Sequence, residues 1–224
     1  MPDKVIPRYS GNLRSHAISV PQCIKECSGI IIFGRRIKSL VFSTDVAIVK
    51  NINADAVLVV YPFTPQPSIA QAIISVSDVP VFVGVGGGVT SGVRSLSLAV
   101  EAEHNGAFGV VVNAPMPTKD IRAIKHTLEI PIIATIVSEK QDFGRRIRAG
   151  ADILNVSAAS QTPEVVRAIR AAYPDIPIIA TGGPTDETIL ETIAAGANAI
   201  TYTPPTNGQL FAESGIAREE VFLC

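Results

Sequence analysis

The sequence is poor in the residues on which several kinds of site depend. Its 224 residues include three cysteines, three histidines and no tryptophan, and only 17% of them are charged. A small, odd number of cysteines does not suit a disulfide framework and is typical of the reducing cytoplasm, where we expect this chain to act. Cys23 and Cys27 lack a second Cys or His pair at the spacing of a zinc site, so we predict no metal ligands.

Charge and hydropathy argue against two further classes of partner. The formal net charge is −1 and no long basic run occurs, so nucleic-acid binding has no support. No apolar run is long enough to span a membrane, and the opening Met-Pro-Asp-Lys does not resemble a secretory signal. Because 47% of the residues are hydrophobic, we expect a large buried core.

What the chain has in abundance is a repeat of short runs rich in Val and Ile. The runs are continuous rather than alternating, as expected of parallel strands that are covered on both faces. The eight runs are residues 39–43, 56–60, 81–85, 108–112, 131–136, 153–156, 177–180 and 199–203.

Helix-like stretches separate these runs, and several of them end in glycine. They are residues 45–51, 67–76, 92–105, 119–128, 142–149, 163–173 and 186–195. Such a succession in one domain predicts an α/β fold, a closed (β/α)8 TIM barrel, over residues 38–224. A doubly wound open sheet is the alternative, but the Gly-x-Gly-x-x-Gly fingerprint at its first turn is missing.

Residues 1–37 do not fit the repeat. Either residues 29–33 form the first strand in place of 39–43, or residues 1–37 are an extension that plugs the barrel or contacts a neighbouring subunit. This extension and the apolar outer helices lead us to predict a homo-oligomer.

The loops that leave the strand C-termini of such a barrel carry its function. Here they are rich in proline, hydroxyl and amide groups, and Asn113, Asn155 and Ser157 are candidates to orient a ligand. Asp45, Glu139 and Lys140 are the strongest acid–base candidates. Asp45 would equally cap the first helix, and Glu139 and Lys140 would equally be solvated charges. Without a Gly-x-Ser-x-Gly elbow or a His-Glu-x-x-His pair, no familiar serine or zinc hydrolase is predicted.

The segment 176–203 is the most informative one, because it forms a strand, a Gly-Gly turn, a helix and a strand in close succession. Thr181, Gly182 and Gly183 let the backbone approach a ligand and open a helix that Thr185 would cap. Backbone N–H groups and the positive end of a helix then point at one place, which suits a phosphate or carboxylate.

This arrangement resembles the aldolase-type barrels, in particular the ribulose-phosphate-binding superfamily of epimerases, synthases and lyases. The resemblance lies in Ala-Thr-Gly-Gly at 180–183 and Gly-Ala-Asn-Ala-Ile at 196–200. It implies a phosphate held between the turn after the seventh strand and a glycine turn after the eighth. Here Thr-Pro-Pro-Thr at 203–206 replaces that glycine; because the two prolines offer no N–H, Thr203 and Thr206 would substitute through their hydroxyls.

The whole chain also resembles a group of bacterial barrels, some of them described only as hydrolases, in residues 33–39, 61–65 and 202–206. Taken together, these patterns predict an enzyme that isomerises, epimerises or cleaves a small phosphorylated, sugar-like metabolite without a cofactor. Asp45 or Glu139 would be the base and Lys140 the electrophile. A non-catalytic metabolite sensor is the alternative. A hydrolase, a flavin-binding barrel and a need for a divalent metal stay open.

Overall fold

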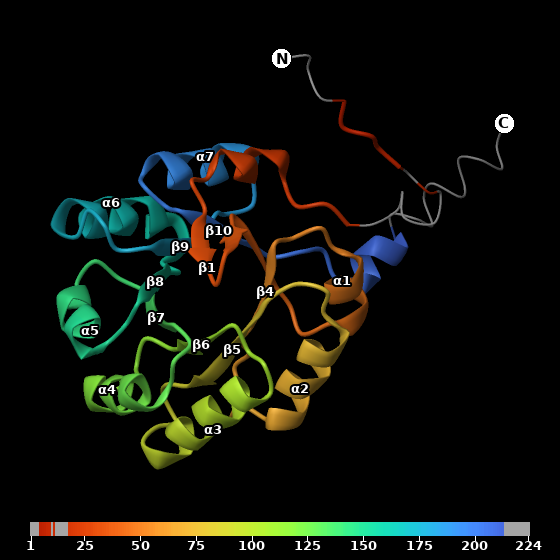
Figure 1. Cartoon of the computed structure of the whole chain (residues 1–224). Helices are drawn as coiled ribbons and strands as arrows, with labels where there is room; N and C mark the ends of the chain where they lie inside the picture. Colours follow the sequence, from red (N-terminus) through yellow and green to blue (C-terminus); the bar gives the residue numbers. More distant parts are fainter. Residues whose placement is uncertain (1–4, 10, 12–17, 213–224) are drawn as a thin grey trace, which may run out of the picture.

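The computed structural model describes residues 5–9, 11 and 18–212, and its centre is a closed barrel of eight parallel strands (Figure 1). The barrel closes where β10 pairs with β3, with Ile200 opposite Ser39. The strands are β3 (Ser39–Phe42), β4 (Ala56–Val59), β5 (Val81–Gly86), β6 (Gly109–Val112), β7 (Ile132–Ile136), β8 (Ile153–Val156), β9 (Ile178–Thr181) and β10 (Ala199–Tyr202). The predicted TIM barrel is therefore confirmed, and the open sheet is excluded.

Seven helices form a ring outside the barrel, each between two consecutive strands of the chain (Figure 1). They are α1 (Val46–Asn51), α2 (Pro67–Val76), α3 (Val93–His104), α4 (Thr118–Thr127), α5 (Phe143–Ala149), α6 (Thr162–Ala172) and α7 (Asp186–Ala194). No helix among the described residues is long and apolar enough to cross a membrane.

An antiparallel hairpin, β1 (Ile30–Ile32) and β2 (Arg35–Ile37), precedes the barrel. Residues 29–33 are therefore not a barrel strand. Ile30, Ile32 and Ile37 are buried in one cluster with Leu40 and other inward-facing strand residues. Because the cluster includes the first residues of several strands, the hairpin closes the N-terminal end of the barrel.

Alternation along the strands divides the core into two parts. One set of side chains faces the helices, and the other fills the barrel interior. The interior set comprises Leu40, Ala56, Leu58, Phe82, Val111, Ile133, Ile153, Ile179 and Ala199.

The N-terminal rim is tied together by side chains that bond to the start of the preceding strand. Asp55 Oδ2 accepts hydrogen bonds from Lys38 N and from Ser39 N and Oγ, at 2.9 to 3.0 Å. Asp152 accepts one from Ile132 N at 2.9 Å, and Asn198 one from Ile178 N at 2.8 Å. These contacts give the Ala-Asp and Ala-Asn dipeptides before alternate strands a structural role at the end opposite the site.

Candidate functional site

The barrel mouth is polar on one half and apolar on the other. Along each strand from β7 to β10, the residue two positions after the buried interior residue also faces inward. These inward-facing residues are Thr135, Asn155, Thr181 and Thr201. On β3 to β5 the corresponding residues are Phe42, Val60 and Gly84. The mouth therefore suits a ligand with one polar side.

Two buried oxygens in the polar half lack a hydrogen-bond partner among the described residues. They are Asn155 Oδ1 and Thr201 Oγ1, on side chains whose residues are only 7% and 6% exposed. Asn155 donates through Nδ2 to Thr135 Oγ1 over a long 3.5 Å. A buried polar atom without a partner is costly, so such atoms mark places where a ligand or an ordered water binds.

A cleft of about 610 Å³ opens beside these residues, between the loops that follow β9 and β10. Thr181, Gly183, Thr203 and Thr206, all predicted ligand-binding residues, line it together with Thr201. Pro204 and Pro205 form part of its wall without an N–H to offer. The Gly183 N–H has no partner among the described residues and is available to an anion.

Close packing explains why both positions of this turn are glycine. A Cβ on Gly182 would lie 2.7 Å from Ile189 Cγ1 and 2.8 Å from Ile200 Cγ2. Gly183 has φ +85°, and its Cβ would lie 2.6 Å from Thr188 Oγ1. The turn therefore needs glycine for its conformation and packing as well as for any ligand.

Thr185 caps α7, and Thr206 caps the helical turns at residues 207–212 by accepting from Gln209 N at 3.3 Å. Thr185 Oγ1 accepts from Thr188 N, and the Thr188 hydroxyl accepts from Thr185 N, which is a reciprocal capping box on α7. Hydrogen bonds from its own backbone N–H and from Thr185 lower the pKa of the exposed Glu187 carboxyl. The N-terminus of α7 is thus satisfied internally, and Gly183 and the hydroxyls of Thr181 and Thr203 are the freer anion donors.

Asp45 is the N-cap of α1. Its Oδ1 accepts from Ala47 N at 2.9 Å and from Ile48 N at 3.2 Å, and its Oδ2 accepts from Asn207 Nδ2 at 2.5 Å. Both carboxylate oxygens are therefore engaged, and a role as base would require Asn207 to move away.

Glu139 and Lys140 are exposed in the loop that follows β7. Neither side chain makes an ion pair or a hydrogen bond in the described part of the chain, although Lys140 N donates to Ser138 Oγ at 3.2 Å. Ser157 is exposed at the end of β8, next to Asn155. The loop with Glu139 and Lys140 therefore begins at the polar half of the mouth, because it follows β7, the strand that carries Thr135.

Asn113 lies apart from the cleft between the β9 and β10 loops. It lines a hollow of about 70 Å³ with Tyr61, Phe63 and Gly87 on the apolar side. A Cβ on Gly87 would lie 2.6 Å from Asn113 Cβ, so this glycine permits close packing of the two loops.

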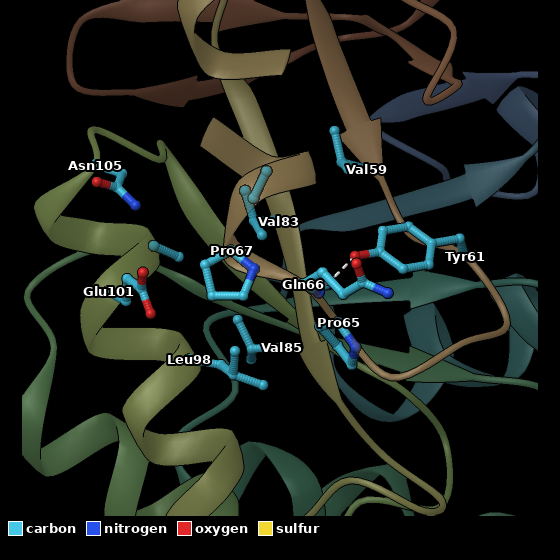
Figure 2. A pocket seen from close by; sticks show the side chains of 13 residues that line it. Val59, Tyr61, Pro65, Gln66, Pro67, Val83, Val85, Leu98, Glu101 and Asn105 are labelled. Atoms are coloured by element: carbon cyan, nitrogen blue, oxygen red, sulfur yellow. Dashed lines mark hydrogen bonds between the residues drawn. The ribbon is translucent and has the colours of Figure 1, made fainter. Parts of the chain in front are cut away.

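A second hollow on this side lies outside the barrel, between β5, α3 and the loop before α2 (Figure 2). Its volume of about 10 Å³ holds no more than a single water. Gln66 N donates to Tyr61 Oη at 2.7 Å across its edge, as Figure 2 shows. It is too small for a metabolite.

No group of three or more His, Cys, Asp or Glu residues that could hold a metal ion occurs in the described ranges. Sequence reasoning missed Thr135 and Thr201, although both follow an interior apolar residue by two positions. It also missed Arg146 of α5, which is only 7% exposed.

No protein-family model matches the sequence, and no curated protein sequence matches it. Solved structures resemble it in fold. Phosphonopyruvate hydrolase, in complex with oxalate and Mg²⁺, has a TM-score of 0.59 and 15% identity, covering 84% of this chain and 82% of that chain. Phosphoenolpyruvate phosphomutase from Streptomyces platensis subsp. rosaceus has a TM-score of 0.59 and 15% identity, covering 83% and 82%.

Thiamine phosphate pyrophosphorylase from Pyrococcus furiosus has a TM-score of 0.56 and 19% identity, covering 74% of this chain and 84% of that chain. Identities this low establish a shared architecture and leave the chemistry to the site itself. The chain shares the closed (β/α)8 barrel of these proteins, which is the fold that the sequence predicts.

Proposed function

We propose that the protein is an enzyme that binds a small phosphorylated metabolite at the C-terminal mouth of the barrel and isomerises it or cleaves it as an aldol-type lyase. One observation carries the proposal. The open Gly183 N–H, just after β9, and the unpartnered Asn155 and Thr201 oxygens, on its neighbours β8 and β10, lie at the same end of the barrel. The structural neighbours support it, because two of them are named for phosphorylated compounds and one for a phosphonate.

The phosphate would bind to the Gly183 N–H and to the hydroxyls of Thr181 and Thr203. Asn155 and Thr201 would then hold a hydroxyl or carbonyl group of the same ligand deeper in the barrel. A carbonyl placed beside an amide donor is polarised toward an enolate, which is the charge that an isomerase or lyase must stabilise.

Of the two predicted bases we favour Glu139, because its carboxylate has no partner among the described residues while both oxygens of Asp45 are engaged. It would remove a proton from the carbon next to the carbonyl, and the electron pair would pass to the carbonyl oxygen. Lys140 and the Asn155 amide would stabilise that oxygen. If the deprotonated carbon carries a hydroxyl, the intermediate is an enediolate: the hydroxyl proton passes to the former carbonyl oxygen, the first carbon becomes the new carbonyl, and return of the abstracted proton to the former carbonyl carbon completes an isomerisation.

A non-catalytic sensor is the second candidate, and one observation favours it. The innermost strand residues of the mouth are Phe42, Val60, Gly84, Asn113, Thr135, Asn155, Thr181 and Thr201, and none of them is ionisable. Such a mouth would bind a ligand well, but it would catalyse a reaction only with the help of Glu139 and Lys140 in the loop after β7.

The experiment has two stages. Thermal unfolding is first measured with a panel of triose, pentose and hexose phosphates, for the wild type, Thr203→Asp and Thr203→Asn. Thr203 is exposed, so neither change should disturb folding. If a compound raises the melting temperature of the wild type and of Thr203→Asn but not of Thr203→Asp, the result supports binding of an anion in this cleft. The absence of a rise with every compound would refute the phosphorylated ligand.

The second stage separates the enzyme from the sensor. The compound that binds is incubated with protein in D₂O, and solvent deuterium entering its carbon positions is followed by proton NMR. Exchange that Glu139→Gln reduces at least about a hundredfold, with binding retained, supports the base. Binding without exchange or turnover establishes the sensor instead.

A further inference from the structure

A second polar cleft lies at the rim, between the loop that enters α4 and the N-terminal half of α5. Its volume is about 460 Å³, within the range of small-molecule sites. Thr118, Lys119, Gln141, Asp142, Arg145 and Arg146 line it. None of these residues lines the cleft between the β9 and β10 loops.

Arg146 is the unusual member. It is only 7% exposed, and no carboxylate lies within 4.0 Å of its guanidinium among the described residues. Nη2 donates to the Ala114 carbonyl in the loop after β6, while Nη1 is buried without a partner. Burial, by removing water from around the charge, lowers the pKa of this guanidinium. A buried cation without a counter-ion is costly unless an anion binds beside it.

The charges around the cleft have the sign that such an anion requires. Lys119 and Arg145 are exposed cations on its wall. The one carboxylate of the lining is Asp142, whose Oδ1 accepts from Arg145 N as the N-cap of α5 and whose Oδ2 lies 4.0 Å from Arg148. Three cations thus face one carboxylate, and that carboxylate is already engaged.

The first turn of α4 adds backbone donors. This ten-residue helix has Pro117 as its N-cap and no capping side chain, unlike α1, α5 and α7. The N–H groups of Thr118 and Lys119 have no partner in the described ranges. The first-turn carboxylate of Asp120 is buried and accepts from Gly92 N at 2.8 Å, in the preceding loop. Uncapped N–H groups and the helix dipole favour an anion here.

We propose that this cleft is an anion site, distinct from the barrel mouth, that binds the phosphoryl or carboxylate group of a small metabolite. The bound group would contact the first turn of α4 on one side and α5 with its preceding loop on the other. That preceding loop also carries Glu139 and Lys140. An anion at the rim would therefore hold in place the loop from which the proposed catalytic charges extend.

Isothermal titration calorimetry of the full chain with inorganic phosphate at low ionic strength tests the site. A double variant, Lys119→Ala with Arg145→Ala, removes the two exposed cations of the rim cleft. Thr203→Asp and Thr203→Asn test the mouth, and Arg94→Ala removes an exposed cation elsewhere as a control. The rim double variant should raise the dissociation constant of one phosphate site at least tenfold. Thr203→Asp and Arg94→Ala should leave that site unchanged.

Unchanged phosphate binding in the rim double variant overturns the proposal. If Thr203→Asp alone then removes binding, phosphate binds only in the mouth and the proposed function survives. If the rim variant removes binding and Thr203→Asp does not, the rim site stands by itself. Arg146→Met serves as a second variant, with circular dichroism to show that it folds, and should weaken the same site.

Discussion

Asn207 donates a hydrogen bond of 2.5 Å to Asp45 Oδ2, although the two residues are 162 positions apart in the chain. The contact joins the loops that follow β3 and β10, the two strands at which the barrel closes. Asp45 caps α1 through its other oxygen. One side chain thus links the first helix to the last loop, at the edge of the proposed phosphate cleft.

This arrangement predicts different outcomes for two substitutions of Asp45. Asp45→Ala removes the cap and the acceptor of Asn207 and should lower the free energy of unfolding by about 1 to 2 kcal/mol, whereas Asp45→Asn keeps the capping oxygen, loses only the bond to Asn207 and should cost clearly less. Urea unfolding measures both. If Asp45→Asn folds normally but loses turnover of the identified substrate, Asp45 rather than Glu139 is the base.

The N-terminal rim yields a prediction about stability alone. Asp55→Ala leaves Lys38 N, Ser39 N and the Ser39 hydroxyl without their acceptor, and should lower the free energy of unfolding by about 3 kcal/mol. Asp55→Asn should cost clearly less, since Asn198 makes the corresponding bond before β10. Equal losses in the two variants would show that the carboxylate charge matters more than the acceptor.

Gly182 offers a test of whether the Gly-Gly turn is shaped by packing. Gly182→Ala places a Cβ against Ile189 and Ile200 and should lower the free energy of unfolding by about 1 to 3 kcal/mol. The matched control is Gly208→Ala. Apart from its chain neighbours and its own helix backbone, a Cβ there would come no closer than 3.9 Å to any described residue, so stability should stay unchanged or rise slightly. Equal stability of Gly182→Ala and wild type would contradict the packing argument.

The sequence predicts the barrel well, because each strand is a continuous apolar run bounded by polar residues. Every barrel strand and every helix of the ring agrees with its predicted range to within one residue at each end. Residues 29–33 were ambiguous, since a three-residue hairpin arm of Ile looks like a barrel strand until its pairing partner is known.

The site is less predictable because its features depend on contacts between distant segments. Thr135 and Thr201 resemble core residues in the sequence, and only the closure of the barrel brings them to its mouth. Thr206, a predicted ligand-binding residue, lines the cleft and also caps the helical turns at residues 207–212, where the Gln209 side chain accepts from Thr206 N at 2.8 Å. The burial of Arg146 depends on Ala114, 32 residues away in another loop.

The thiol of Cys27 predicts how stability depends on pH. Cys27 is buried in the core cluster that faces the outer helices, and loss of solvation raises the pKa of its thiol to about 12. The thiol ionises in the unfolded chain at about pH 8.5, so unfolding releases a proton at any pH between these two values. The stability that the neutral thiol confers is therefore fully present below pH 8.5 and is lost as the pH rises toward 12.

Urea unfolding at several pH values from 8 to 10.5 measures this loss, with Cys27→Ala as the comparison. Titration of lysine and tyrosine affects both proteins alike. The wild type should therefore lose up to about 1.4 kcal/mol more per pH unit than the variant once the unfolded thiol ionises. Parallel curves for the two proteins would mean that the Cys27 thiol ionises in the folded protein as readily as in the unfolded chain, which would contradict its burial.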